Sequence, residues 1–107
     1  MANFKFGDIV LLTFPFTGLA AVKKRPAMVL KDTDDGDFIV CRITSQSYYS
    51  AFDVKVDDWK SYGLKLPSTI RLHKIASLEK KMAEKVIGRL DNNLKLSIRK
   101  VIYSLLS

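Results

Sequence analysis

The sequence predicts a mainly β fold, a small and mostly antiparallel barrel with a C-terminal helix. Short apolar segments rich in β-branched residues recur along most of the chain and are separated by Asp, Gly and Pro. Near the end of the chain, the hydrophobic period lengthens to that of an amphipathic helix. The strand–helix alternation of a parallel sheet and internal repeats are both missing from the pattern. The 107 residues are enough for one domain, which we expect to span residues 1–107.

Five strands are expected, and each is bounded by a recognisable break. They cover residues 7–14, 26–30, 38–44, 52–56 and 68–78. Pro15 ends the first, and the Asp- and Gly-rich residues 31–37 suit a tight turn between the second and third. In the fourth, strict alternation places Asp53 and Lys55 on a solvent-facing side. In the fifth, the apolar phase slips near Lys74, which indicates a bulge or a sharp bend.

The last segment is predicted to be an amphipathic helix. Its apolar positions follow the i, i+4, i+7, i+8 spacing at Leu94, Ile98, Val101, Ile102, Leu105 and Leu106. Asp91 precedes them and is a suitable N-cap, because a short carboxylate can accept hydrogen bonds from the free N–H groups of the first turn.

The composition of the chain favours some classes of function and argues against others. A formal net charge of +7 and a pI near 9.6 favour an anionic partner, either nucleic acid or an acidic protein. The N-terminus lacks a secretion signal, so we expect a cytoplasmic protein, and no apolar run is long enough to span a membrane. The single cysteine, Cys41, and the single histidine, His73, argue against a disulfide, a zinc cluster or a two-histidine nuclease mechanism. No metal or other cofactor is therefore expected.

Three consecutive cations precede a proline at residues 23–26. We expect Lys23, Lys24 and Arg25 to end the loop after the first strand and to lead into the second. Pro26 disfavours helical dihedral angles at Arg25, so the guanidinium would project from extended backbone. Its planar set of donors suits a phosphate group. The alternative is that all three are solvated loop charges with no specific role.

A second polar group follows the third strand. Thr44, Ser45 and Gln46 carry hydroxyl and amide groups that can bind a phosphate or a base edge, although a plain polar loop has the same composition. Tyr48 and Tyr49 could stack on unpaired bases or could cover the core instead.

The order of these segments resembles that of the MazF/PemK toxin family. The resemblance rests on "GDIVLLTFPFTGLAAVKKRPAMVL", "ITSQ", "LKLPSTIRLHKI" and "KVIGRL", and it spans nearly the whole chain. It implies an SH3-like barrel with a C-terminal helix that forms a homodimer and cleaves single-stranded RNA without a metal. It also implies a partner, the acidic antitoxin of a type II toxin–antitoxin pair. One departure is Gly18, where relatives often carry an acidic residue.

The resemblance also assigns roles to residues. Arg25 matches the catalytic arginine and Thr44 the catalytic hydroxyl residue of the family, while Ser68 matches a serine near the RNA groove. The expected RNA-binding residues are Lys23, Lys24, Ser45, Gln46 and Ser68. Two alternatives remain: a toxin that poisons DNA gyrase through protein contacts, as the related CcdB group does, and a nucleic-acid-binding barrel without catalysis.

Overall fold

The computed structural model describes residues 3–15 and 22–107, which form one sheet, one α-helix and two short 3-10 helices. The strands are β1 (Asp8–Pro15), β2 (Val22–Asp32), β3 (Asp37–Thr44), β4 (Asp53–Val56), β5 (Ser68–Glu79) and β6 (Ala83–Arg89). The helices are η1 (Trp59–Tyr62), η2 (Lys80–Met82) and α1 (Asn92–Leu105). None of the helices in the described part of the chain has the length and apolar character needed to cross a membrane.

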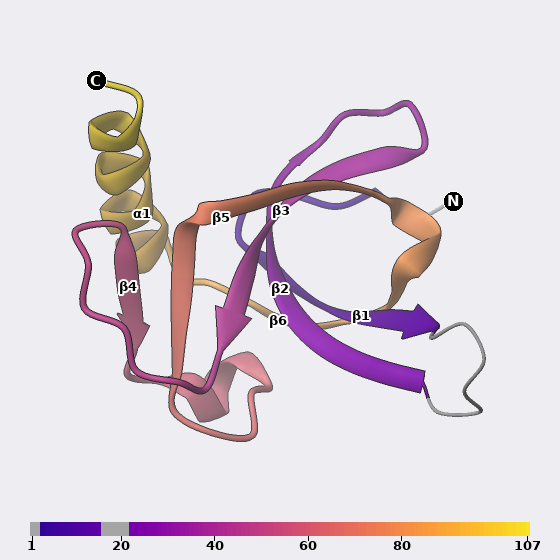
Figure 1. Ribbon diagram of the computed structural model, residues 1–107, viewed down its shortest axis with the longest axis horizontal. Coiled ribbons are helices and arrows are strands. Elements are labelled where there is room, and N and C mark those ends of the chain that lie inside the picture. Colours follow the sequence, from indigo (N-terminus) through magenta and orange to yellow (C-terminus); the bar gives the residue numbers. More distant parts are fainter. Residues whose placement is uncertain (1–2, 16–21) are drawn as a thin grey trace.

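The six strands form a single antiparallel sheet in the order β4-β5-β3-β2-β1-β6. The sheet coils strongly, so that β1, β2 and β6 curve round one end of the molecule while α1 stands at the other (Figure 1). The predicted antiparallel β fold with a C-terminal helix is confirmed. The sheet is not closed, however, because β4 and β6 remain its two edges. β6 was not among the expected strands, and its half-exposed burial pattern explains the weak sequence signal.

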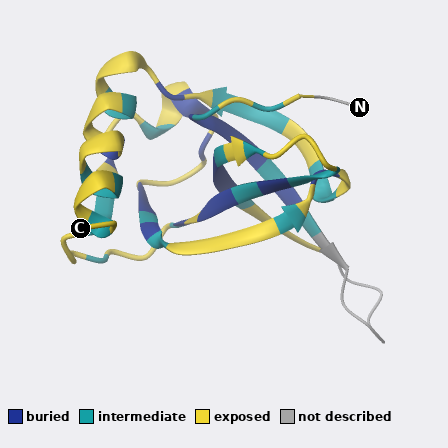
Figure 2. Ribbon diagram, turned by 90° about the horizontal axis from the view of Figure 1, so that it is seen from above, coloured by how far each residue is buried: buried dark blue, intermediate teal, exposed yellow. Residues whose placement is uncertain are grey.

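Both faces of the sheet carry apolar side chains. In the β1–β2 ladder, the pair Ile9 and Met28 belongs to one core cluster, whereas the next pair, Val10 and Ala27, belongs to another. This follows from the two-residue period of a strand, which sends successive side chains to opposite faces. α1 covers the first cluster with Ile98, and its outward side is exposed (Figure 2). The sheet that carries the site therefore has a packed apolar cluster on each face.

The phase slip in β5 is a bulge with a sharp bend. A single step on β3, from Cys41 to Arg42, corresponds on β5 to the longer step from Ile75 to Arg71. The residues between them, including Lys74, have no partner in the ladder, and the ribbon of β5 turns sharply along its length (Figure 1). The prediction of a bulge near Lys74 is therefore confirmed. β5 pairs with β3 on both sides of the bend, whereas it pairs with the short β4 only before the bend.

Two expectations about strand position were wrong. β2 begins at Val22, so Lys23, Lys24 and Arg25 lie within a strand and not in the preceding loop, because they pair with the end of β1. Asp53 does not face solvent either, since its side chain is only 1% exposed and forms an ion pair with Arg71. Alternation alone could not show that a loop would cover that side of the sheet.

A close backbone contact holds η1 against β6. Gly63 ends η1 with a φ of +75°, and a Cβ atom there would lie 2.1 Å from the carbonyl oxygen of Ile87. A Cβ atom on Gly88 would lie 2.2 Å from the carbonyl oxygen of Tyr62. Only glycine permits this approach on both sides. The contact sets the course of the chain after η1, which contributes one wall of the groove described below.

α1 begins as predicted. The Oδ1 atom of Asp91 accepts a hydrogen bond of 2.8 Å from the backbone N–H of Leu94, which makes Asp91 the N-cap. This backbone hydrogen bond lowers the pKa of the Asp91 carboxyl, and a second one from the hydroxyl of Tyr62 adds to the effect. Leu106 does not join the buried face, because the helix ends at Leu105 and Leu106 is exposed.

Candidate nucleic-acid interface

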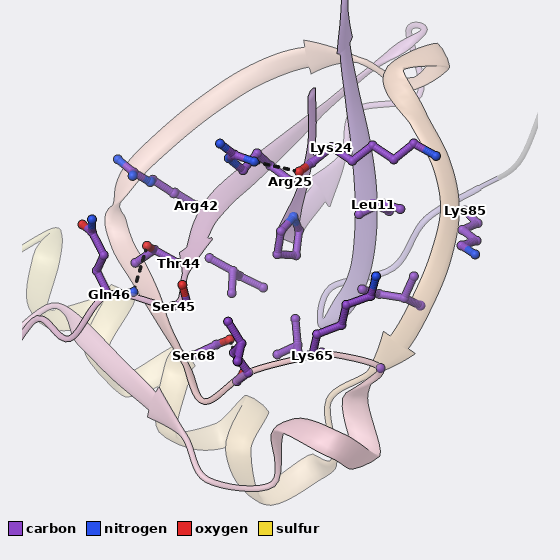
Figure 3. Close-up of a pocket in the computed structure, with 16 residues that line it drawn as sticks. Leu11, Lys24, Arg25, Arg42, Thr44, Ser45, Gln46, Lys65, Ser68 and Lys85 are labelled. Atoms are coloured by element: carbon purple, nitrogen blue, oxygen red, sulfur yellow. Dashed lines mark hydrogen bonds between the residues drawn. The ribbon is translucent and has the colours of Figure 1, made fainter. Parts of the chain in front are cut away.

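A groove of about 660 Å³ runs between the coiled sheet and the segment after η1. Its walls come from β1, β2, β3, β6 and residues 63–68 (Figure 3). Five cationic side chains line it, namely Lys24, Arg25, Arg42, Lys65 and Lys85. No carboxylate is among the described residues of its lining. The groove is therefore suited to a polyanion.

The strand register places Arg25, Arg42 and Thr44 on one face of the sheet. Arg25 and Ala27 are two residues apart on β2, and Ala27 pairs directly with Arg42 on β3. Arg42 and Thr44 are again two residues apart. Because paired residues and residues at i, i+2 share a face, the three side chains lie on the same side. Figure 3 shows Arg42, Thr44 and Gln46 gathered at one side of the groove.

Arg25 is exposed, and one interaction orients its guanidinium. The Nη1 atom donates a hydrogen bond of 3.0 Å to the backbone carbonyl of Lys24 (Figure 3). The guanidinium has five N–H donors, so most of them remain directed to solvent. An extended, partly oriented guanidinium at the groove wall can bind a phosphate through two parallel hydrogen bonds.

The hydroxyl of Thr44 is arranged to donate a hydrogen bond to a ligand in the groove. Its Oγ1 atom accepts a hydrogen bond of 3.2 Å from the backbone N–H of Gln46. This bond uses a lone pair and leaves the hydroxyl proton for another acceptor. Thr44 is the last residue of β3, so the ladder holds its backbone while its side chain lies in the lining of the groove. The arrangement fits a donor to a phosphate oxygen.

Lys23 and Lys24 project from the start of β2 in different directions. Lys24 lines the groove, and its Nζ atom lies 2.9 Å from the Oε2 atom of Glu84 on β6. The hydrogen bond from Lys24 lowers the pKa of the Glu84 carboxyl. Lys23 is exposed and is not among the described residues that line the groove. Gly18 lies outside the described residues.

The remaining predicted site residues also reach the groove. Ser45, Gln46 and Ser68 all belong to its lining. Ser45 and Gln46 are exposed, whereas Ser68 is buried and its hydroxyl donates a hydrogen bond of 2.8 Å to the carbonyl of Leu66. Ser68 thus holds the segment that forms the wall, and its oxygen can still accept a hydrogen bond.

Arg42, Lys65 and Lys85 are groove residues that the sequence reasoning missed. Arg42 carried a usable signal, because a charged residue inside the apolar strand "FIVCRIT" stands two positions before Thr44 and must share its face. No sequence pattern indicated that Lys65 and Lys85 would line the groove, since their positions depend on how η1 and β6 meet.

The other candidates noted in the sequence lie outside the groove lining. Tyr48 stacks on Arg71, with 3.6 Å between Cζ and the ring centroid, and Tyr49 is exposed. His73 is partly buried, with its Nε2 atom 3.3 Å from Nη2 of Arg71. Burial raises the pKa of the Cys41 thiol to about 12. Among the described residues, no three His, Cys, Asp or Glu side chains are grouped to hold a metal ion.

Solved structures share this architecture. The Mycobacterium tuberculosis toxin MazF-mt6 has a TM-score of 0.76 with this chain at 19% identity, and the match covers 92% of this chain and 95% of that one. A mycobacterial endoribonuclease in complex with its cognate antitoxin has a TM-score of 0.73 at 14% identity, and the match covers 97% of this chain and 95% of that one. A MazE–MazF structure from Deinococcus radiodurans has a TM-score of 0.75 at 22% identity, and the match covers 94% of each chain. At these identities the likeness establishes the fold. A search of curated protein sequences found no significant match.

The coiled antiparallel sheet, the C-terminal helix and the cation-lined groove define a small basic β protein with a groove suited to a polyanion. Residues 5–106 match the profile of the PemK-like, MazF-like toxins of type II toxin–antitoxin systems, and the chain belongs to this family. The resemblance seen in the sequence is thereby confirmed.

Proposed function

We propose that this toxin is an endoribonuclease that cleaves single-stranded RNA at specific sequences without a metal ion. The observation that carries the proposal is the position of Arg25 and Thr44 on one face of the sheet, in a groove lined by cations and by no carboxylate of the described chain. Relatives of the same fold are named as endoribonucleases, which supports this activity. Cleavage of cytoplasmic mRNA would inhibit growth.

RNA supplies the nucleophile in this mechanism. The 2′-oxygen gives its proton to a general base and attacks the adjacent phosphorus, the bond from phosphorus to the 5′-oxygen breaks, and the leaving 5′-oxygen takes up a proton. The products are a 2′,3′-cyclic phosphate and a free 5′-OH. The protein then needs only to align the groups and to stabilise the charge that develops on the phosphorane.

Arg25 and Thr44 suit these two tasks. The guanidinium of Arg25 would neutralise the developing charge and assist the leaving oxygen, while the Thr44 hydroxyl would donate to a non-bridging oxygen. Lys23 and Lys24 would hold flanking phosphates and raise the rate of encounter. Ser45, Gln46 and Ser68 would contact the bound RNA from the groove wall.

The proposal includes two protein partners. Relatives are seen in complex with an antitoxin, and we expect an acidic antitoxin segment to occupy the same cationic groove here. We also expect a homodimer, as the sequence resemblance implies. Antitoxin binding should weaken with added salt and should compete with RNA.

The test is incubation of purified protein with a long RNA in excess EDTA, followed by analysis of fragment ends. Cleavage at defined sites with 2′,3′-cyclic phosphate and 5′-OH ends is expected. Replacing the ribose 5′ of a mapped site with 2′-deoxyribose should abolish cutting and retain binding, because only the reacting atom is removed. Cleavage of the deoxy substrate contradicts the mechanism. Intact RNA together with inhibited gyrase indicates a CcdB-like toxin instead.

A further inference from the structure

The segment after Thr44 is fastened to β5 through Arg71. The Cζ atom of Arg71 lies 3.6 Å from the centroid of the Tyr48 ring, and its Nε atom donates a hydrogen bond of 2.8 Å to Oδ1 of Asp53. The Arg71 and Asp53 side chains are only 12% and 1% exposed. Because a shielded ion pair is costly to break, the guanidinium is a rigid platform for the Tyr48 ring.

Asp53 ties down the far end of the same segment. Its Oδ2 atom accepts hydrogen bonds from the backbone N–H of Ser50 at 3.0 Å and from the Ser50 hydroxyl at 2.7 Å. One carboxylate oxygen therefore holds Arg71 and the other holds Ser50. The Tyr48 ring, between these two points, has little freedom to leave its position.

The anchored Tyr48 in turn orients Gln46. Its hydroxyl donates a hydrogen bond of 2.8 Å to Oε1 of Gln46, whose backbone N–H bonds Thr44 as described above. A glutamine side chain has one carbonyl acceptor and an NH2 group with two donors. With the carbonyl bound to Tyr48, the exposed Gln46 presents its donors to a ligand in the groove.

We propose that Gln46, held by Tyr48 and Arg71, selects the RNA base beside the scissile phosphate. The inference rests on the proposed function. The NH2 group can donate to O4 of uracil or O6 of guanine, whereas cytosine and adenine place an amino donor at that position. Gln46 thus favours uracil or guanine, and Tyr48 and Arg71 are positioning residues that act through it.

The proposal is tested with RNA oligonucleotides that contain a mapped cleavage site. Each base flanking the cut is exchanged in turn, uracil for cytosine or guanine for adenine, and kcat/KM is measured for each pair. At one flanking position, the wild type should prefer the carbonyl-bearing base by on the order of tenfold, because a donor facing a donor leaves both unpaired. Equal cutting of both members of every pair overturns the proposal.

Two variants separate recognition from folding. Tyr48→Phe keeps the ring on Arg71 and removes only the hydroxyl, so the preference should fall to within about twofold while the preferred RNA is still cut. Gln46→Glu presents a carboxylate acceptor and should reverse the preference toward cytosine or adenine. The matched control is Tyr103→Phe on α1, where the residue is 79% exposed, and it should leave the preference unchanged. An unchanged base preference in Tyr48→Phe contradicts the proposal.

A measurement without RNA distinguishes failure of this inference from failure of the proposed function. Nuclear magnetic relaxation of the Gln46 side-chain NH2 group should show an ordered group in the wild type and a mobile one in Tyr48→Phe. Identical mobility in the two proteins overturns the role of Tyr48, even if RNA is cut. A wild type that cuts no RNA overturns the proposed function, and base selection with it, whatever the order of Gln46.

Discussion

The Nζ atom of Lys80 lies 3.1 Å from both carboxylate oxygens of Asp32, and these side chains are only 4% and 10% exposed. The same carboxylate accepts a hydrogen bond of 2.9 Å from the backbone N–H of Phe4. The end of β2, the 3-10 helix η2 and the N-terminal segment are therefore joined at one carboxylate, at the margin of the second core cluster.

This junction predicts loss of stability in acid. The backbone hydrogen bond from Phe4 is the largest cause that lowers the pKa of Asp32 to about 2, from 3.8. Burial alone would raise the pKa of Asp53, but hydrogen bonds from Arg71 and Ser50 outweigh it and lower that pKa to about 2 as well. Both carboxylates stabilise the fold above pH 3.8, and their contribution is lost as the pH falls toward 2.

Urea unfolding measured across this pH range should show the midpoint falling with pH in the wild type. Asp32→Asn should be less stable than the wild type near neutral pH and should show a shallower acid dependence, because one of the two linked protons is removed. If the stability of Asp32→Asn falls with pH as steeply as that of the wild type, then groups other than Asp32 cause the loss of stability in acid.

Arg25→Ala should lower RNA cleavage by at least about 10³-fold, because a guanidinium that stabilises phosphoryl charge contributes on that scale. Its free energy of unfolding should change by no more than about 0.5 kcal/mol, since the side chain is exposed. The control is Lys100→Ala, which removes an exposed cation on α1 that is not among the described residues lining the groove. Single-turnover rates and urea titrations provide the two measurements, and full activity in Arg25→Ala would refute its catalytic role.

Thr44→Ala should lower the rate of the chemical step by about 10²–10³-fold, the usual effect of losing one hydrogen bond to a transition state. Thr44→Ser keeps the hydroxyl and should retain most of the activity. Binding of a 2′-deoxy substrate should remain close to that of the wild type in both variants. If Thr44→Ser is as slow as Thr44→Ala, then the hydroxyl is not the group that matters.

Gly88→Ala should destabilise the fold by about 1–3 kcal/mol, because the new methyl group meets the carbonyl of Tyr62. It should also lower RNA cleavage by the folded protein, since the displaced segment carries Lys65 into the groove wall. Gly36→Ala is the comparison, because an alanine would be strained at the φ of +92° found there, but nothing lies within 4 Å of the new atom. It should lose stability while keeping its activity, and equal loss of activity in both would contradict the argument.

The sequence by itself determined the class of fold, the bulge near Lys74 and the N-cap at Asp91, and its resemblance to a toxin family made Arg25 and Thr44 site candidates. These features have local causes: strand and helix periods, a capping side chain, and charged or hydroxyl residues next to a strand. Tertiary structure decided that β6 pairs with β1, that the sheet stays open, and that Lys65 and Lys85 face Arg42 across a groove. It also buried Asp53 beneath a loop. Such features depend on contacts between distant segments, and the hydrophobic pattern of one segment does not record what will cover it.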